Sequence, residues 1–419
     1  MTNDLLTVEE CAVCDGGRLF VAPTSARDLV ALEGSVHGGP NMLPAEHDVL
    51  PALAAALLDA GTLKRSKAAI REALAARGIT IGFAASGDRT YFSGQCFPED
   101  LEALLAALCE CLSGAAFPEG EVANVKALSL GSLAEEKSDT RAQAERALAA
   151  HLYDPTHVNY ARPVQDEERS VRLATRTDLL EFKKGLGVGG LVIAIAGDVT
   201  SASARAAVEK TFGKLGKGTT SVPVKHSNTK LPTAGESVIS IADKANVDVL
   251  LGVALPLTMY DERYHAMKVL VEMLGGGFTS HLMQTIRERD GLTYGVYARL
   301  AGLESGADGS FKIWASFSPG RYAESVAKLR EEVARFFARG LTPTALTLSK
   351  ERMAGLYLVS LSTTQNLASA LHSVGVQGRE LAYLTAYPDL IRAVSIADLK
   401  RAAAMIPLDK LSLVAAGTL

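Results

Sequence analysis

Apolar residues recur along the chain at helical and strand spacing, and the two spacings alternate in blocks. Apolar positions three and four residues apart predict helices over 48–60, 66–77, 99–112, 119–136, 139–151 and 176–184 in the first half. Strand-like runs occur near 19–21, 29–32, 79–95 and 191–197. Strands in pairs and helices in runs predict an α+β fold, with helices layered on one face of an antiparallel-rich sheet.

The same order of elements occurs twice. Asp178-Leu179 precede the apolar run LVIAIAGDV, and Asp398-Leu399 precede LSLVAAGTL, 220 residues later. Gly197 and Gly417, which close these runs, are also 220 residues apart. A nearly constant offset over several elements indicates an internal repeat. We therefore predict two homologous domains of about 200 residues each.

A segment without apolar periodicity separates the two copies. Residues 216–237 read GKGTTSVPVKHSNTKLPTAGES and are rich in Gly, Thr, Ser and Pro, which is typical of an exposed linker. The predicted organisation is a first domain over 1–215, a linker over 216–237 and a second domain over 238–419.

The charge balance excludes some classes of partner. The chain has 43 basic and 47 acidic residues and a net charge of −4, whereas nucleic-acid binding needs a basic patch. No run of 18 uncharged apolar residues occurs, so no membrane span is expected. The first residues carry acids where a signal peptide needs a basic region, so we expect a cytoplasmic protein.

Five cysteines give an odd number and no disulfide framework, which suits a reducing compartment. Cys11-x-x-Cys14 has the spacing of half a zinc site or of a redox pair. The alternative is two ordinary thiols at the first strand, and the absence of a second Cys/His pair nearby favours it.

The segment 274–298, LGGGFTSHLMQTIRERDGLTYGVYA, has the clearest local pattern. Three glycines at 275–277 predict a loop, an apolar stripe predicts a short helix, and Asp290-Gly291 predicts its end. The strand that follows is predicted to place on one face Leu292, Tyr294, Val296 and Ala298.

This segment resembles the second domain of the pitrilysin/insulinase family of zinc metallopeptidases, whose members commonly read L-G-G-G-x-x-S-x-L-x-x-x-I-R-E-x-x-G-L-x-Y. The close match covers about 20 residues, and the repeat extends the resemblance over nearly the whole chain. It implies that Arg287 and Tyr294 face an active site, and that Gly275, Gly276 and Gly277 form a substrate-binding loop. Taken singly, these residues have simpler explanations: a turn, an exposed cation at a helix end and a half-buried strand aromatic.

The resemblance also implies a metal motif, H-x-x-E-H, in the first domain, and this chain lacks it. Counting back from Gly61-Thr62 places the two His and the Glu at Ala52, Ala56 and Ala55. Alanine neither binds zinc nor activates water. The region of the third ligand, around Ser129–Ser132, has no acid, and none of the eight histidines forms a H-x-x-x-H pair.

The sequence therefore predicts the non-metal subunit of a heterodimeric zinc endopeptidase, forming half of a clamshell. No cofactor is expected in this chain. Zinc is expected in a homologous partner that carries H-x-x-E-H, and the substrate is a peptide. Two alternatives remain open: a non-proteolytic scaffold, like the core proteins of the respiratory cytochrome bc complex, and a homodimeric peptide-binding module.

Overall fold

The computed structural model describes residues 8–218, 234–303 and 306–419, and they form two units. Unit 1 comprises 8–131, 167–218 and 358–386, and unit 2 comprises 132–166, 234–303, 306–357 and 387–419. Two helices of 18 residues, α4 (Glu119–Glu136) and α11 (Pro343–Ser360), carry the chain from one unit into the other. Each unit is thus assembled from both halves of the sequence.

Unit 1 is built on a six-stranded sheet with the order β1-β2-β6-β3-β5-β4. β2 and β6 are parallel, and the other pairs are antiparallel. The strands are β1 (Glu9–Val13), β2 (Gly17–Pro23), β3 (Val30–His37), β4 (Thr80–Ser86), β5 (Arg89–Cys96) and β6 (Val192–Gly197).

Both faces of this sheet are covered, because its central strand β6, VIAIAG, is apolar and buried at every position. Leu19, Val21 and Ile193 belong to a core with the helices α1 (Leu50–Ala55), α2 (Lys67–Ala75), α3 (Leu101–Gly114), α7 (Arg176–Lys184) and α8 (Ser201–Phe212). Phe20 and Ala194, on the alternate face, pack against α12 (Thr364–Val376).

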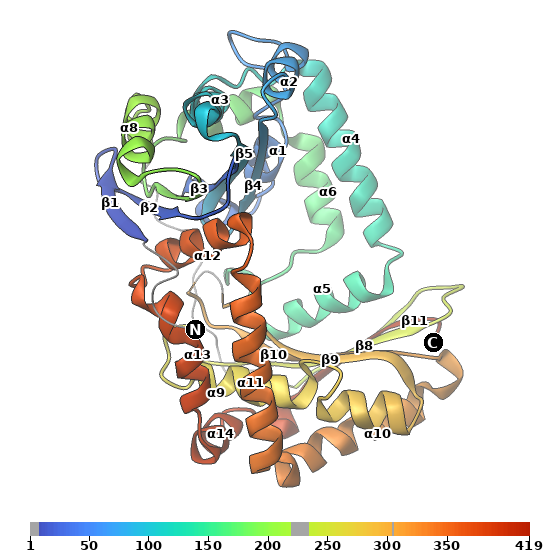
Figure 1. Cartoon of the computed structure of the whole chain (residues 1–419). Coiled ribbons are helices and arrows are strands. Elements are labelled where there is room, and N and C mark those ends of the chain that lie inside the picture. The colour runs from blue at the N-terminus through green and yellow to red at the C-terminus, as the bar shows by residue number, and fades with distance from the viewer. Residues whose placement is uncertain (1–7, 219–233, 304–305) are drawn as a thin grey trace. The chain divides into compact units, whose positions relative to one another are not determined.

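Unit 2 repeats this plan with a five-stranded sheet in the order β7-β11-β8-β10-β9. Its strands are β7 (Glu236–Ser240), β8 (Val247–Ala254), β9 (Thr293–Ala301), β10 (Ser310–Phe317) and β11 (Ser412–Gly417). Figure 1 shows α5 (Thr140–Leu152) on one side of this sheet and α9 (Tyr264–Gly275) and α10 (Tyr322–Arg335) on the other. The remaining helices are α6 (Val164–Leu173), α13 (Ala382–Ala393) and α14 (Ile396–Ala403).

The predicted α+β class with two similar sheet-and-helix units is confirmed. The repeat extends to hydrogen bonds: α7 and α14 both begin with a capping box, formed by Thr175 with Asp178 and by Ser395 with Asp398. The structure adds a second helical layer, since α5 and α12 each cover the sheet face opposite the other helices. The two helices occupy corresponding positions in the repeat. α5 of unit 2 comes from the first half of the sequence, and α12 of unit 1 comes from the second half.

Some boundaries differ from the pattern. The helix expected over 48–60 ends at Ala55, because the chain turns and pairs Gly61 with Ser66. The periodicity did not reveal α6 and α8. Most of the predicted linker, 219–233, lies outside the described residues. No helix in the described ranges is long and apolar enough to cross a membrane.

Candidate functional site

The glycine run lies at the end of α9 rather than in an open loop. Gly275 is buried, and a Cβ there would come within 2.3 Å of the Ala298 backbone nitrogen on β9. Gly276 is the C-cap of α9, and a Cβ on Gly277 would meet the Arg352 guanidinium at 2.4 Å. Gly275 therefore permits close packing of α9 on β9, and substrate binding by the three glycines stays a prediction.

Arg287 lies on a π-helix, Met283–Arg289, which follows the glycine run. The wider winding is seen at its end, where the Asp290 N–H donates to the Thr285 carbonyl five residues back, at 2.9 Å. Gly291, in the left-handed region at φ 58°, then turns the chain into β9. Short π-helical stretches carry an inserted residue and are frequent at functional sites.

The Arg287 guanidinium is partly exposed, and its contacts with the described residues are weak. Its Nε lies 3.5 Å from Glu288 Oε1, and its Cζ lies 5.5 Å from the centre of the Phe278 ring. The Phe278 side chain is itself 71% exposed. The guanidinium therefore keeps donors available for an incoming carbonyl or carboxylate.

Tyr294 is 96% exposed, which is unusual for a tyrosine on a strand. Within the described residues its hydroxyl makes no hydrogen bond. The prediction that Tyr294 shares a face with Val296 and Ala298 is wrong. Those two side chains are buried, while that of Tyr294 points outward.

The physical reason is a β-bulge. Thr293 pairs with Phe317 and Val296 pairs with Ala315, so Tyr294 and Gly295 together oppose the single residue Ser316. The Thr293 hydroxyl supports the bulge by accepting the Gly295 N–H at 3.1 Å and donating to the Gly295 carbonyl at 2.8 Å. A bulge re-aims one side chain of a strand, and here it turns Tyr294 out of the sheet.

The three alanines at the positions predicted for the metal motif lie on and just after α1, in unit 1. Ala52 and Ala56 are exposed and Ala55 is buried. Among the residues that the structure describes, no group of three His, Cys, Asp or Glu side chains is placed to hold a metal ion. Glu136, near the expected third ligand, is paired with Arg146 at 2.7 Å.

The Cys-x-x-Cys pair lies at the β1–β2 turn. Burial raises the pKa of the Cys14 thiol to about 12, and neighbouring Glu209 contributes in the same direction. The Cys14 Sγ lies 3.7 Å from Glu209 Oε2. A protonated, buried thiol fits the ordinary structural interpretation of this pair.

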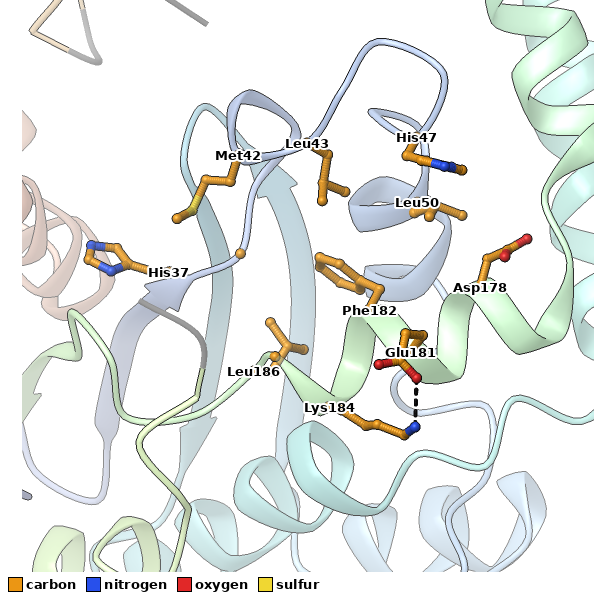
Figure 2. A pocket seen from close by; sticks show the side chains of 12 residues that line it. His37, Met42, Leu43, His47, Leu50, Asp178, Glu181, Phe182, Lys184 and Leu186 are labelled. Atoms are coloured by element: carbon orange, nitrogen blue, oxygen red, sulfur yellow. Dashed lines mark hydrogen bonds and ion pairs between the residues drawn. The ribbon is translucent and has the colours of Figure 1, made fainter. Parts of the chain in front are cut away.

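A pocket of about 410 Å³ lies between the start of α1 and α7, also in unit 1. Figure 2 shows Met42, Leu43, Phe182 and Leu186 turned toward the space. The charged side chains at its rim are engaged locally, as in the 2.6 Å ion pair of Glu181 with Lys184. The pocket is therefore apolar and lacks the convergent polar groups of a catalytic site.

Sequence reasoning missed two residues that shape the site in unit 2: Gly295 and Glu332. Gly295 lies in the bulge, and a Cβ there would make a tight contact of 3.0 Å with the Trp314 ring. Glu332 is a fully buried carboxylate on α10. The sequence pattern could have revealed this residue, because an acidic side chain stands on the apolar face of a helix, beside Leu329 and Val333.

Comparison with known proteins agrees with this description. A family model described as the peptidase M16 inactive domain matches residues 174–353, which include Arg287 and Tyr294. An uncharacterized zinc protease of Mycobacterium leprae is 27% identical over 318 residues, covering 75% of this chain and 70% of the relative. The non-peptidase homolog YmxG of Helicobacter pylori is 23% identical over 330 residues, covering 76% and 72%.

Solved structures share the fold. The crystal structure of a peptidase M16 inactive domain from Pseudomonas fluorescens superposes with a TM-score of 0.88 at 22% identity, covering 99% of both chains. The periplasmic protease PqqL of Escherichia coli gives a TM-score of 0.76 at 14% identity, and the match covers 99% of this chain and 47% of PqqL.

The chain thus shares the fold of a peptidase M16 inactive domain, and it has alanine at 52, 55 and 56, the positions predicted for the metal motif. Residues 174–353 match the peptidase M16 inactive domain, and the relatives and solved structures extend this similarity over most of the chain.

Proposed function

We propose that this chain is the non-metal subunit of a heterodimeric zinc endopeptidase. It binds the peptide and supplies Arg287 and Tyr294 to the zinc site of a homologous chain that carries H-x-x-E-H. The observation that carries this proposal is the bulge that leaves Tyr294 96% exposed. An exposed aromatic side chain whose hydroxyl makes no hydrogen bond within the described residues is available to contact a ligand or a second chain.

The two side chains suit peptide hydrolysis. When zinc-bound water attacks a peptide carbonyl, negative charge develops on the carbonyl oxygen. A phenol O–H and a guanidinium are donors that stabilise this oxyanion more than the ground state. The partner supplies the metal, and this chain supplies fixed donors and a surface for the peptide.

The edge strand β4 supports peptide binding by unit 1. The other edge strands carry charges that discourage strand addition: Glu9 and Glu10 on β1, Glu236 on β7 and Arg299 on β9. β4 reads TIGFAAS and has no charge. An uncharged edge can receive an extended peptide through backbone hydrogen bonds, and β4 lies against α1, where the family's metal motif would stand.

The five cysteines are free, which supports action in a reducing compartment such as the cytoplasm. The alternative function is a scaffold without any part in proteolysis. The Helicobacter pylori relative, named a non-peptidase homolog, favours this second candidate.

Steady-state cleavage by the reconstituted pair tests the proposal. Tyr294→Phe and Arg287→Ala, made in this chain, should each lower the kcat of the pair by about 10²–10³-fold. Assembly and the partner's zinc content should stay normal. Tyr260→Phe and Arg321→Ala are matched controls, since both side chains are about half exposed in unit 2.

The outcome separates the two candidates. If both site variants keep more than about half of the wild-type kcat/KM, a difference of about 0.4 kcal/mol, the chain is a scaffold. A pair that needs this chain for activity but loses turnover in both site variants supports the shared site.

A further inference from the structure

Glu332 is a charged residue in the core of unit 2. Its side chain is fully buried on α10, and one histidine and two arginines contact its carboxylate, with the Lys328 ammonium 3.9 Å from Oε1. His281 Nε2 lies 3.0 Å from Oε2, while Arg289 Nη2 and Arg335 Nη1 each lie 2.9 Å from Oε1.

Two of these partners bracket the helix that carries Arg287. His281 lies just before the π-helix Met283–Arg289, and Arg289 is its last residue. One carboxylate therefore holds both ends of this helix, with Arg287 between them. Asp290 adds a second contact to Arg289 at 2.7 Å, and the Arg289 side chain lowers the pKa of Asp290.

Unit 1 shows that packing does not require this charge. The short helices Pro98–Asp100 and Pro319–Arg321 are 221 residues apart, and α3 and α10 follow them directly. The same offset matches Glu332 with Cys111, which is also fully buried. Burying a carboxylate costs desolvation energy that a small apolar residue avoids. The charge in unit 2 therefore calls for a reason other than packing.

We propose that Glu332 is a positioning residue, which clamps both ends of the π-helix and so fixes the direction of Arg287 and the entry into β9. This inference rests on the proposed function for the meaning of Arg287, but the clamp itself is testable without a partner. The clamp acts through His281 and Arg289, and Glu332 does not touch the substrate.

Amide hydrogen exchange of the purified chain is the first test. Glu332→Gln keeps the size of the side chain and removes its charge, and it should raise exchange in 283–291 by about ten-fold or more, because charge-assisted hydrogen bonds are lost. Exchange in the unit 1 sheet should not change. Glu324→Gln is the matched control, since Glu324 is an exposed carboxylate on the same helix and pairs with Arg321, which is not one of the Glu332 partners.

If Glu332→Gln folds poorly, variants of its two partners on the π-helix side still test the clamp. His281→Gln and Arg289→Gln each release one end of the helix, and both side chains are partly exposed at 22% and 45%. Exchange should rise mainly at the released end. Unchanged exchange in all three variants would overturn the clamp.

Cleavage by the reconstituted pair is the second test. Glu332→Gln should lower kcat by about ten-fold with little change in KM, and Glu332→Asp should restore part of it. In the Arg287→Ala background, Glu332→Gln should have no further effect. A full additive loss would overturn the positioning role. If Arg287→Ala itself does not matter, the shared site fails, and the exchange experiment alone decides the clamp.

Discussion

The edge of the sheet in unit 1 and the edge of the sheet in unit 2 follow the same path but present different surfaces. In unit 1, α2 is a regular helix, and β4 pairs with β5 in unbroken register from Thr80 to Ser86. In unit 2, the corresponding helix is a π-helix and β9 carries a bulge. An inserted residue in the helix and another in the strand present Arg287 and Tyr294 at the surface. The difference shows how a repeated fold can expose different side chains without new elements.

The helices α12 and α5 offer a second comparison. His372 on α12 is buried and lies 2.8 Å from the Ser35 hydroxyl, which also accepts a hydrogen bond from buried Arg89 at 2.7 Å. The corresponding contact in unit 2 is apolar: a Cβ on Gly252 of β8 would come within 2.9 Å of the Leu148 side chain on α5. At this matched position the helix–sheet contact is thus polar in unit 1 and apolar in unit 2.

Removing the bulge should have the largest effect. Deletion of Gly295 makes β9 as regular as β4 and re-aims Tyr294, so kcat/KM of the reconstituted pair should fall about 100-fold or more, or about 2.7 kcal/mol. Adding Tyr294→Phe to the deletion should cost nothing further, because the hydroxyl is already misplaced. An unchanged cleavage rate for the deletion would show that the bulge is not what makes the two edges functionally different.

The polar contact of α12 should make unit 1 sensitive to acid. Burial, aided by Arg89, lowers the pKa of His372 to about 3, so the folded state disfavours its protonation. The unfolded chain binds this proton below pH 6.5, and stability should therefore fall as the pH falls, by about 2 kcal/mol between pH 6.5 and 5. Glu33, whose pKa burial raises, acts in the opposite direction at lower pH.

Urea unfolding of wild type and His372→Gln at pH 7, 6 and 5 measures this slope. Glutamine can keep a hydrogen bond to Ser35 and does not titrate, so the variant should lose most of the dependence. Parallel curves for the two proteins would rule out His372 as the origin.

The glycines of two helices should respond oppositely to the same substitution. Gly275→Ala inserts a Cβ 2.3 Å from the Ala298 nitrogen and should cost about 1–3 kcal/mol in the free energy of unfolding. Gly355→Ala, on α11, meets open space and should stabilise by up to about 1 kcal/mol, because alanine is the better helix former. Chemical denaturation reports both, and a neutral Gly275→Ala would refute the packing role of this glycine.

Removing either capping box should have the smallest effect on stability, and the two removals should lower the free energy of unfolding by nearly the same amount. Thr175→Ala and Ser395→Ala each remove the side-chain acceptor of a helix N-terminus and should each cost about 1 kcal/mol. Thermal unfolding of both variants is sufficient. A difference well above about 1 kcal/mol between them would mean that the repeat is matched in geometry but not in energy.

The sequence by itself determined the features that depend on local order. The 220-residue offset of Gly197 and Gly417 indicated the repeat, alternating runs indicated the fold class, and alanine at 52, 55 and 56 predicted the loss of the metal motif. These conclusions need only the residue types and their spacing, because helix and strand periods are properties of neighbouring residues.

Only the tertiary structure decided how the site is presented. Strand alternation predicted Tyr294 on the buried face, whereas the pairing of β9 with β10 contains a bulge that turns it outward, with Gly295 packed closely against Trp314 on the adjacent strand. The burial of Glu332 depends on the contact of α10 with the π-helix. The packing of α5 on the sheet of unit 2 and of α12 on the sheet of unit 1 depends on the apolar second face of each sheet. Such features arise from contacts between residues far apart in the chain, and a local pattern carries no record of which distant strand or helix will lie against it.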